Sequence, residues 1–71
     1  LDAGDIVVHR DHGLARFQGL LNMELAGMRG DFLHLEFRDG DRLYVPVDRL
    51  HLISRYQGPG DTVPALDRLG S

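Results

Sequence analysis

The middle of the chain, residues 31–37, reads Asp-Phe-Leu-His-Leu-Glu-Phe, in which apolar and polar side chains alternate. Successive side chains of a β-strand point to opposite faces, so this spacing is typical of a strand with one buried face. Leu33, Leu35 and Phe37 share one face, and Phe32 shares the other with the polar side chains. The pattern predicts a strand here, with the trio of Leu33, Leu35 and Phe37 in the core.

Turn-forming residues flank this strand on both sides. Residues 26–30 contain two glycines, which predicts a hairpin to a long extended segment over residues 14–25. Gly19 lies inside that segment, and a glycine within a strand often marks a bulge or bend. Asp39-Gly40 indicates a tight turn, after which Leu43 and Val45 should point inward and Tyr44 outward, until Pro46 ends the strand.

The outer parts of the chain complete an all-β pattern. The β-branched run at residues 6–9 predicts a first strand, residues 47–50 allow a single helical turn, and residues 51–56 predict a fifth strand. Five short strands with tight turns predict a small five-stranded SH3-like or Tudor-like barrel over residues 1–57. Residues 58–71, rich in Gly and Pro at their start, are expected to form a C-terminal exit linker.

The composition limits the classes of protein to which the chain can belong. The 71 residues allow one domain, and 42% hydrophobic with 27% charged residues is typical of a soluble globular chain. With no cysteine, no apolar run of membrane-spanning length and no signal-peptide pattern, we expect a cytoplasmic monomer without membrane contact. Leu1 in place of an initiator methionine indicates a fragment of a longer protein.

Enzyme chemistry has few candidate residues. Ser54 and Ser71 are the two serines, and neither a phosphate-binding glycine loop nor a cysteine nucleophile is present. Asp39 and Asp41 fall in a predicted turn, where Asp bonds nearby backbone N–H groups. Three residues within four positions, His9, Asp11 and His12, could form a metal site with two further histidines, His34 and His51. Polar turn chemistry already explains the segment Asp11-His12-Gly13. We therefore expect no catalysis, no metal and no cofactor.

Nucleic-acid binding is an alternative function for a small barrel. The chain has arginines that, with Tyr44 and Tyr56, are of the types that contact a phosphate backbone and stack on bases. Eleven acidic residues against eight basic ones give a net charge of −3, which opposes attraction to phosphate. We therefore expect no direct nucleic-acid partner.

One apolar segment is the most informative feature. Four apolar side chains occur in six residues that carry one charge: Leu20, Leu21, Asn22, Met23, Glu24 and Leu25. So small a chain does not easily bury both faces of this stretch, which leaves either Leu20 or the other three facing away from the core. Two interpretations stay open, a strand that fills the core and an edge strand that accepts a partner's strand.

The chain resembles the RNA polymerase-interacting domain of bacterial transcription-repair coupling factors, a family that shares its barrel with CarD-type transcription regulators. The resemblance covers nearly the whole chain. It is carried by Gly4-Asp5, Val7-Val8-His9, Asp11-His12-Gly13-Leu14, Arg16-Phe17, residues 31–37, Leu43-Tyr44-Val45-Pro46-Val47 and residues 50–56. The terminal Pro64, Leu66, Leu69 and Gly70 resemble the segment leading to the coupling factor's ATP-driven translocase, which the shorter CarD-type regulators lack.

The resemblance implies a partner and a contact strand. The partner is the N-terminal lobe of the RNA polymerase β subunit, bound by strand addition along Leu20 to Leu25 so that the parent protein reaches stalled polymerase and recruits excision repair. The outward position of the contact strand falls on Met23, with Leu21 and Leu25 in phase, a bulge near Gly19, and Tyr44 on a neighbouring strand. The family varies at Met23 and Tyr44 between apolar, aromatic and basic residues, which implies main-chain pairing more than fixed side-chain contacts.

Overall fold

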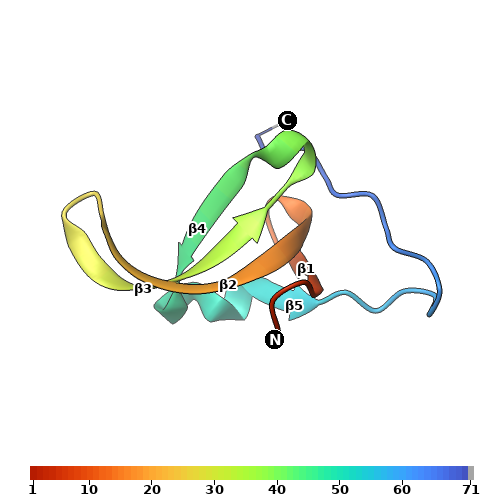
Figure 1. Ribbon diagram of the computed structural model, residues 1–71, viewed down its shortest axis with the longest axis horizontal. Helices are drawn as coiled ribbons and strands as arrows, with labels where there is room; N and C mark the ends of the chain where they lie inside the picture. Colours follow the sequence, from red (N-terminus) through yellow and green to blue (C-terminus); the bar gives the residue numbers. More distant parts are fainter. Residues whose placement is uncertain (71) are drawn as a thin grey trace.

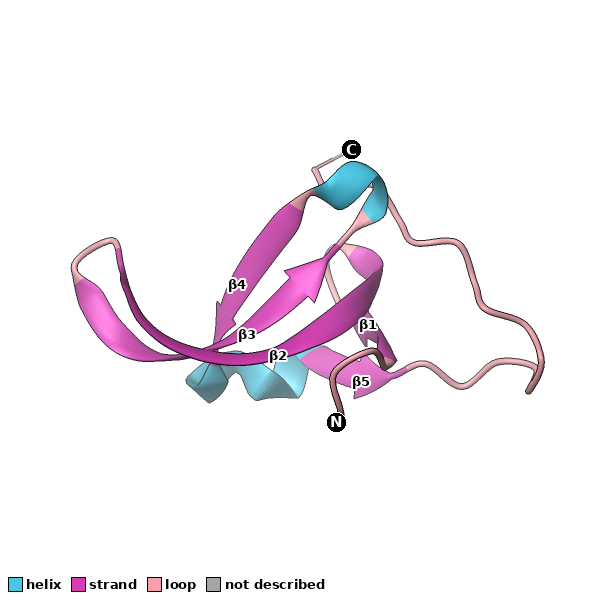
Figure 2. Ribbon diagram, viewed as in Figure 1, coloured by secondary structure: helices cyan, strands magenta, loops and turns pink. Residues whose placement is uncertain are grey.

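Five antiparallel strands in one sheet make up the fold. The computed structural model describes residues 1–70. Its strands are β1 (Ile6–His9), β2 (Gly13–Leu25), β3 (Met28–Glu36), β4 (Arg42–Pro46) and β5 (Ile53–Arg55), with short 3₁₀ helices η1 (Arg38–Gly40) and η2 (Val47–Leu52). The strand order is β4-β3-β2-β1-β5 (Figures 1 and 2). The prediction of an all-β, five-stranded fold is confirmed.

The sheet is strongly curved. Figure 1 shows β2 and β3 bending together, with their hairpin turned away from the rest of the molecule. β4 and β5 form the two ends of the sheet order, and η2 connects them along the chain without a strand pairing between them in residues 1–70. Closure into a barrel therefore stays a prediction.

The core lies on one face of this sheet. Seven buried residues pack there: Val7, Ala15, Phe17, Leu33, Leu35, Phe37 and Val45. The predicted core positions of Leu33, Leu35 and Phe37 are confirmed, since none is more than 2% exposed. Val45 pairs with Leu33 on this side, as the alternation along β4 predicted.

The predicted bend at Gly19 is a β-bulge. The register between β2 and β3 shifts between Phe17 and Gly19, and Gly19 adopts a φ of 119° that favours glycine. Phe17 pairs with Leu35 before the shift, and Leu20 pairs with Leu33 after it. The bulge therefore keeps both Phe17 and Leu20 on the core side of the sheet.

The β2–β3 hairpin is longer than the sequence predicted. Its loop contains two residues, Ala26 and Gly27, with φ of 52° and 80°. Positive φ at both central residues is the type I′ geometry, whose twist matches that of paired strands. Met28 therefore follows directly as the first residue of β3, three positions before the predicted strand start.

The end of the fold differs from the sequence prediction around η2. Leu52 is buried, and its carbonyl accepts a hydrogen bond from the Arg10 N–H at 2.9 Å. The Ile53 N–H donates back to the Leu50 carbonyl and closes the helical turn, so the fifth strand begins at Ile53 instead of residue 51. Phe32 also differs, because it is buried although it lies on the face opposite the core cluster.

The C-terminal segment returns to the sheet. Asp67 binds Leu14 through its backbone N–H at 2.9 Å and through its carboxylate at 2.6 Å, and its carbonyl accepts the Arg38 N–H at 2.8 Å. Gly13, with a φ of 89°, leaves the space that the Asp67 carboxylate occupies. The domain boundary at residue 57 stays a prediction, and the segment after it contacts the domain.

His9 is a buried histidine at the end of β1. Its Nδ1 accepts a hydrogen bond from the Asp11 N–H at 3.0 Å, and its ring lies 4.7 Å from that of His12. Burial, then the adjacent His12, lowers the pKa of His9 below 6.5; the Arg10 charge acts in the same direction and that of Asp11 opposes it. The fold therefore favours the neutral imidazole.

The free energy of unfolding is expected to fall as the pH drops below about 6.5, since the unfolded chain then binds more protons at His9 than the folded one does. Urea unfolding at about pH 7.5 and about pH 5.5 measures this difference. His9→Leu should flatten the pH dependence in this window. An unchanged slope in His9→Leu would show that His9 does not contribute.

Candidate partner-binding edge

The second half of β2 is open on one side. β1 pairs with β2 only from Gly13 to Arg16, and the backbone of Gly4 and Asp5 covers Phe17 through hydrogen bonds of 2.7 and 2.8 Å. From Gly19 to Leu25, the described strands pair with β2 only through β3. β2 is thus central in the strand order, yet its apolar segment is an edge.

The two faces of this edge segment differ in polarity. Leu20 and Asn22 pair with Leu33 and Asp31, which places them on the core side of the hairpin. Leu21, Met23 and Leu25 point to the opposite face. The register gives these three side chains the common phase that was predicted, with Leu21 and Leu25 each 41% exposed and Met23 half-buried. Their part in partner binding stays a prediction.

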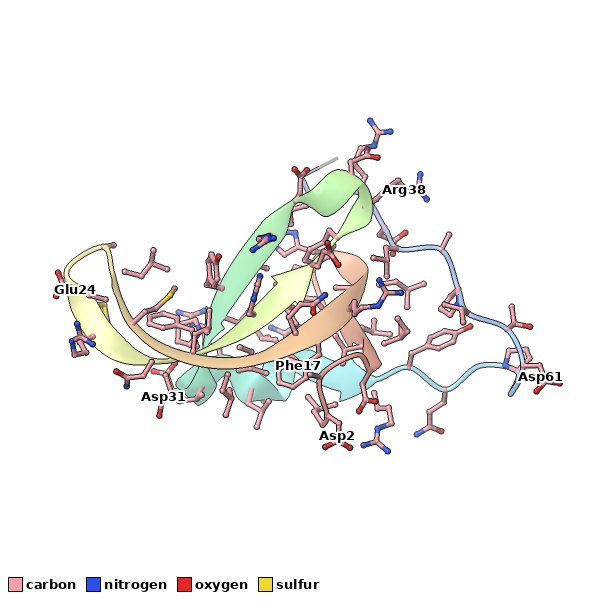
Figure 3. The ribbon with its side chains drawn as sticks, viewed as in Figure 1. Asp2, Phe17, Glu24, Asp31, Arg38 and Asp61 are labelled. Atoms are coloured by element: carbon pink, nitrogen blue, oxygen red, sulfur yellow. The ribbon has the colours of Figure 1, made fainter. Side chains whose placement is uncertain are left out.

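Polar contacts hold the hairpin beside this edge. The Asn22 side-chain amide donates to Asp31 Oδ1 at 2.9 Å, and its Oδ1 accepts from Arg29 at 3.2 Å. Glu24 lies opposite Arg29 in the strand register, near the hairpin tip (Figure 3). These cross-strand contacts fix the hairpin geometry, and the free backbone groups of β2 point away from β3.

Tyr44 lies on the outward face, as predicted, but not next to Met23. It pairs with His34, and the two rings stack with centroids 5.0 Å apart. β3 separates β4 from β2, so the expectation that Tyr44 occupies a strand adjoining the contact strand is wrong. On the outer face, Tyr44 therefore lies beside His34 of β3, and His34 in turn lies opposite Gly19 of β2.

Sequence reasoning missed Met28 on the outer face, and it placed Phe32 on that face without predicting its burial. Met28 pairs with Leu25 and is 69% exposed, whereas Phe32 pairs with Leu21 and is buried. They extend the apolar outer face, formed by Leu21, Met23, Leu25, Met28 and Phe32, across the hairpin. Recognition of Ala26-Gly27 as a two-residue turn would have placed Met28 in the strand.

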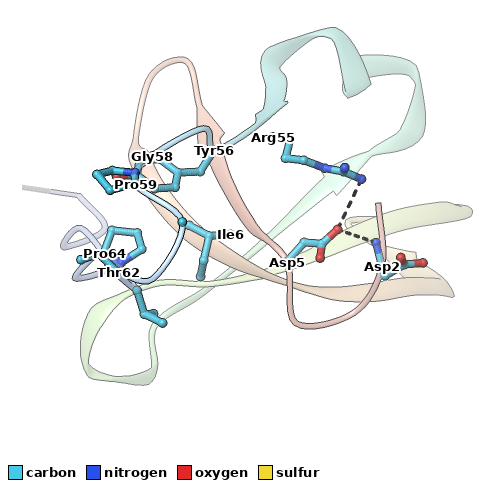
Figure 4. A pocket seen from close by; sticks show the side chains of 11 residues that line it. Asp2, Asp5, Ile6, Arg55, Tyr56, Gly58, Pro59, Thr62 and Pro64 are labelled. Carbon is cyan, nitrogen blue, oxygen red and sulfur yellow. Dashed lines mark hydrogen bonds and ion pairs between the residues drawn. The ribbon is translucent and has the colours of Figure 1, made fainter.

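Two other candidate sites offer fewer free binding groups. His9 and His12 adjoin, but in residues 1–70 no group of three or more His, Asp or Glu side chains gathers as a metal site. An open hollow of about 340 Å³ lies between the N-terminal segment and the stretch after β5 (Figure 4). There Asp5 binds the Asp2 N–H at 2.9 Å and Arg55 at 3.7 Å, so the hollow's one arginine is already paired.

Comparisons with known proteins give a consistent match. Residues 1–57 match the family model of the CarD-like/TRCF RID domain. The transcription-repair-coupling factor of Myxococcus xanthus is 45% identical over all 71 residues, that of Haemophilus influenzae 44% over 71, and that of Escherichia coli strain K12 43% over 70, or 99% of the chain. The chain spans about 6% of the length of each of these relatives.

No helix in the described part of the chain is long and apolar enough to cross a membrane.

Proposed function

The chain belongs to the CarD-like/TRCF RID domain family, the RNA polymerase-interacting domains of transcription-repair coupling factors, and we propose that it binds polymerase through the open edge of β2. In this proposal, a strand from the N-terminal lobe of the β subunit adds to the sheet along Leu20 to Leu25. Strand addition gives affinity through main-chain hydrogen bonds and specificity through alternate side chains.

The open edge of β2 is the observation that carries this proposal. In a hairpin closed by a two-residue turn, the residues flanking the turn exchange hydrogen bonds, and the pairs alternate from there. From Leu25 and Met28 at the turn, this alternation directs the main-chain N–H and C=O groups of Leu20, Asn22 and Glu24 to the open side. These three residues offer hydrogen bonds to an added strand.

The outer face explains why an apolar edge is retained. Exposed apolar edges are normally blunted by charge or proline because they promote aggregation. Here Leu21, Met23 and Leu25 line the edge, and the one charged side chain in the segment, Glu24, lies on the other face. A polymerase lobe that covers these side chains would prevent aggregation along the edge, and their burial would stabilise the complex.

The role in the parent protein follows as part of the proposal. The domain would bring a coupling factor with ATP-driven translocase activity to stalled polymerase for transcription-coupled repair, while residues 1–57 dock as a monomer and residues 58–71 lead onward. A CarD-type regulator would use the same lobe. The matches to coupling factors along 99% or more of the chain favour a coupling factor over a CarD-type regulator as the parent protein.

Isothermal titration calorimetry of the chain against the isolated N-terminal β lobe of M. xanthus RNA polymerase tests the proposed function. We expect one-to-one binding that changes little between low and moderate salt. A nucleic-acid-binding domain would instead bind duplex or single-stranded DNA with an affinity that falls steeply with salt. Absence of lobe binding, or salt-sensitive DNA binding alone, would contradict the proposal.

A further inference from the structure

An apolar groove adjoins the open edge on the core side of the sheet. It has a volume of about 540 Å³, and its apolar lining residues include Leu1, Phe17, Leu20, Val47, Leu50 and Ile53. Four of these are exposed, from 43% for Val47 to 61% for Leu20. Contiguous exposed apolar side chains on a small domain mark an interaction surface.

The groove lies where an added strand would pass. Its walls come from the N-terminal residue, from β2 at Leu20, from η2 at Val47 and Leu50, and from β5. Figure 1 shows η2 beneath the crossing of β2 and β3, with the N-terminal segment beside it. Arg55 lines the groove as its one charged residue and is paired with Asp5 at 3.7 Å.

We propose that the strand added to β2 inserts apolar side chains into this groove. The inference rests on the proposed function, because it states where the side chains on the second face of the same added strand would lie. Side chains of that strand alternate between the two faces of the sheet, so every second one lies on the side of Leu20. The groove begins at Leu20, whose main chain faces the open side, and therefore receives those side chains.

The chemistry of the groove selects the occupant. With apolar walls and a paired arginine, it fits a partner strand that carries aliphatic or methionine side chains at alternate positions on this face. A second copy of this chain would present Leu20, Asn22 and Glu24 on that side, since these three alternate on the core-side face. Two of the three are polar, so a polymerase strand with an apolar groove face fits better.

Leu50→Asp tests the groove without altering β2, because Leu50 is 49% exposed and lies on η2. We expect affinity for the M. xanthus β lobe to fall about tenfold, as the loss of a buried leucine contact predicts. Val63→Asp is the matched control: Val63 is 73% exposed and lines the separate hollow near the C-terminal segment. Its affinity should stay unchanged.

Methyl NMR of the unsubstituted chain provides a second measurement that does not depend on the variant folding. Adding the lobe should shift the methyl signals of Leu20, Val47 and Leu50 and leave those of Val63 in place. If Leu50→Asp binds normally and these signals stay fixed while Met23→Asp loses binding, the groove proposal is overturned and edge docking stands. If Met23→Asp also binds normally, the proposed function itself fails.

Discussion

Met23→Asp is expected to lower affinity for the polymerase β lobe about a hundredfold. Met23 is half-buried at the centre of the outer apolar face, with Leu21 and Leu25 on either side along the strand. The substitution removes an apolar contact and places a carboxylate where strand addition would exclude water. Asp is also too short for its charge to reach solvent along the strand, unlike a long basic side chain.

The fold should tolerate Met23→Asp. Met23 pairs with Gly30, which has open space around it, and it is not part of the core cluster. Calorimetric titration measures the affinity, and urea unfolding checks that the free energy of unfolding changes by less than about 1 kcal/mol. Val63→Asp again serves as a control for an added surface charge. Unaltered affinity in a folded Met23→Asp chain would exclude the outer face as the interface.

Backbone N-methylation of Asn22 is expected to weaken lobe binding by about tenfold to a hundredfold, because a partner carbonyl loses its donor and the methyl group obstructs the added strand. A chain of 71 residues is accessible to chemical synthesis, which allows one amide hydrogen to be replaced by a methyl group. The Asn22 side chain stays intact and keeps its hydrogen bonds to Asp31 and Arg29. The free energy of unfolding should therefore change little.

Two comparisons isolate the backbone effect. N-methylation at Gly60, in the segment after β5, should leave both affinity and stability unchanged. Asn22→Ala removes the side-chain contacts and retains the N–H, so it should bind more tightly than the N-methylated chain. Equal affinity of the N-methyl-Asn22 chain and the unmodified chain would rule out main-chain pairing at this position.

Much of the fold was predictable because it depends on local alternation and turn chemistry. The spacing of Leu33, Leu35 and Phe37 identified the core face of β3, and Gly19 indicated the bulge that the register shift shows. The bulge in turn fixed Met23 outward, in phase with Leu21 and Leu25. The role of Met23 in partner binding stays a prediction.

The features that were not predicted depend on contacts that sequence spacing does not reveal. Asp67 binds Leu14 across 53 positions, so nothing near either residue marked the return of the C-terminal segment. Ala26 adopts a positive φ that is uncommon for alanine, which concealed the two-residue turn and the strand position of Met28. The place of β3 between β2 and β4, which separates Tyr44 from Met23, follows from strand order and not from the spacing of either strand.

Amide hydrogen exchange in the complex tests most directly whether a polymerase strand adds to β2. In the free chain, we expect the N–H groups of Leu20, Asn22 and Glu24 to exchange quickly and those of Leu21 and Met23, directed at β3, to exchange slowly. Binding of the β lobe should slow exchange at the first three residues and leave Val63 unchanged. Fast exchange at Leu20, Asn22 and Glu24 in a saturated complex would contradict strand addition at this edge.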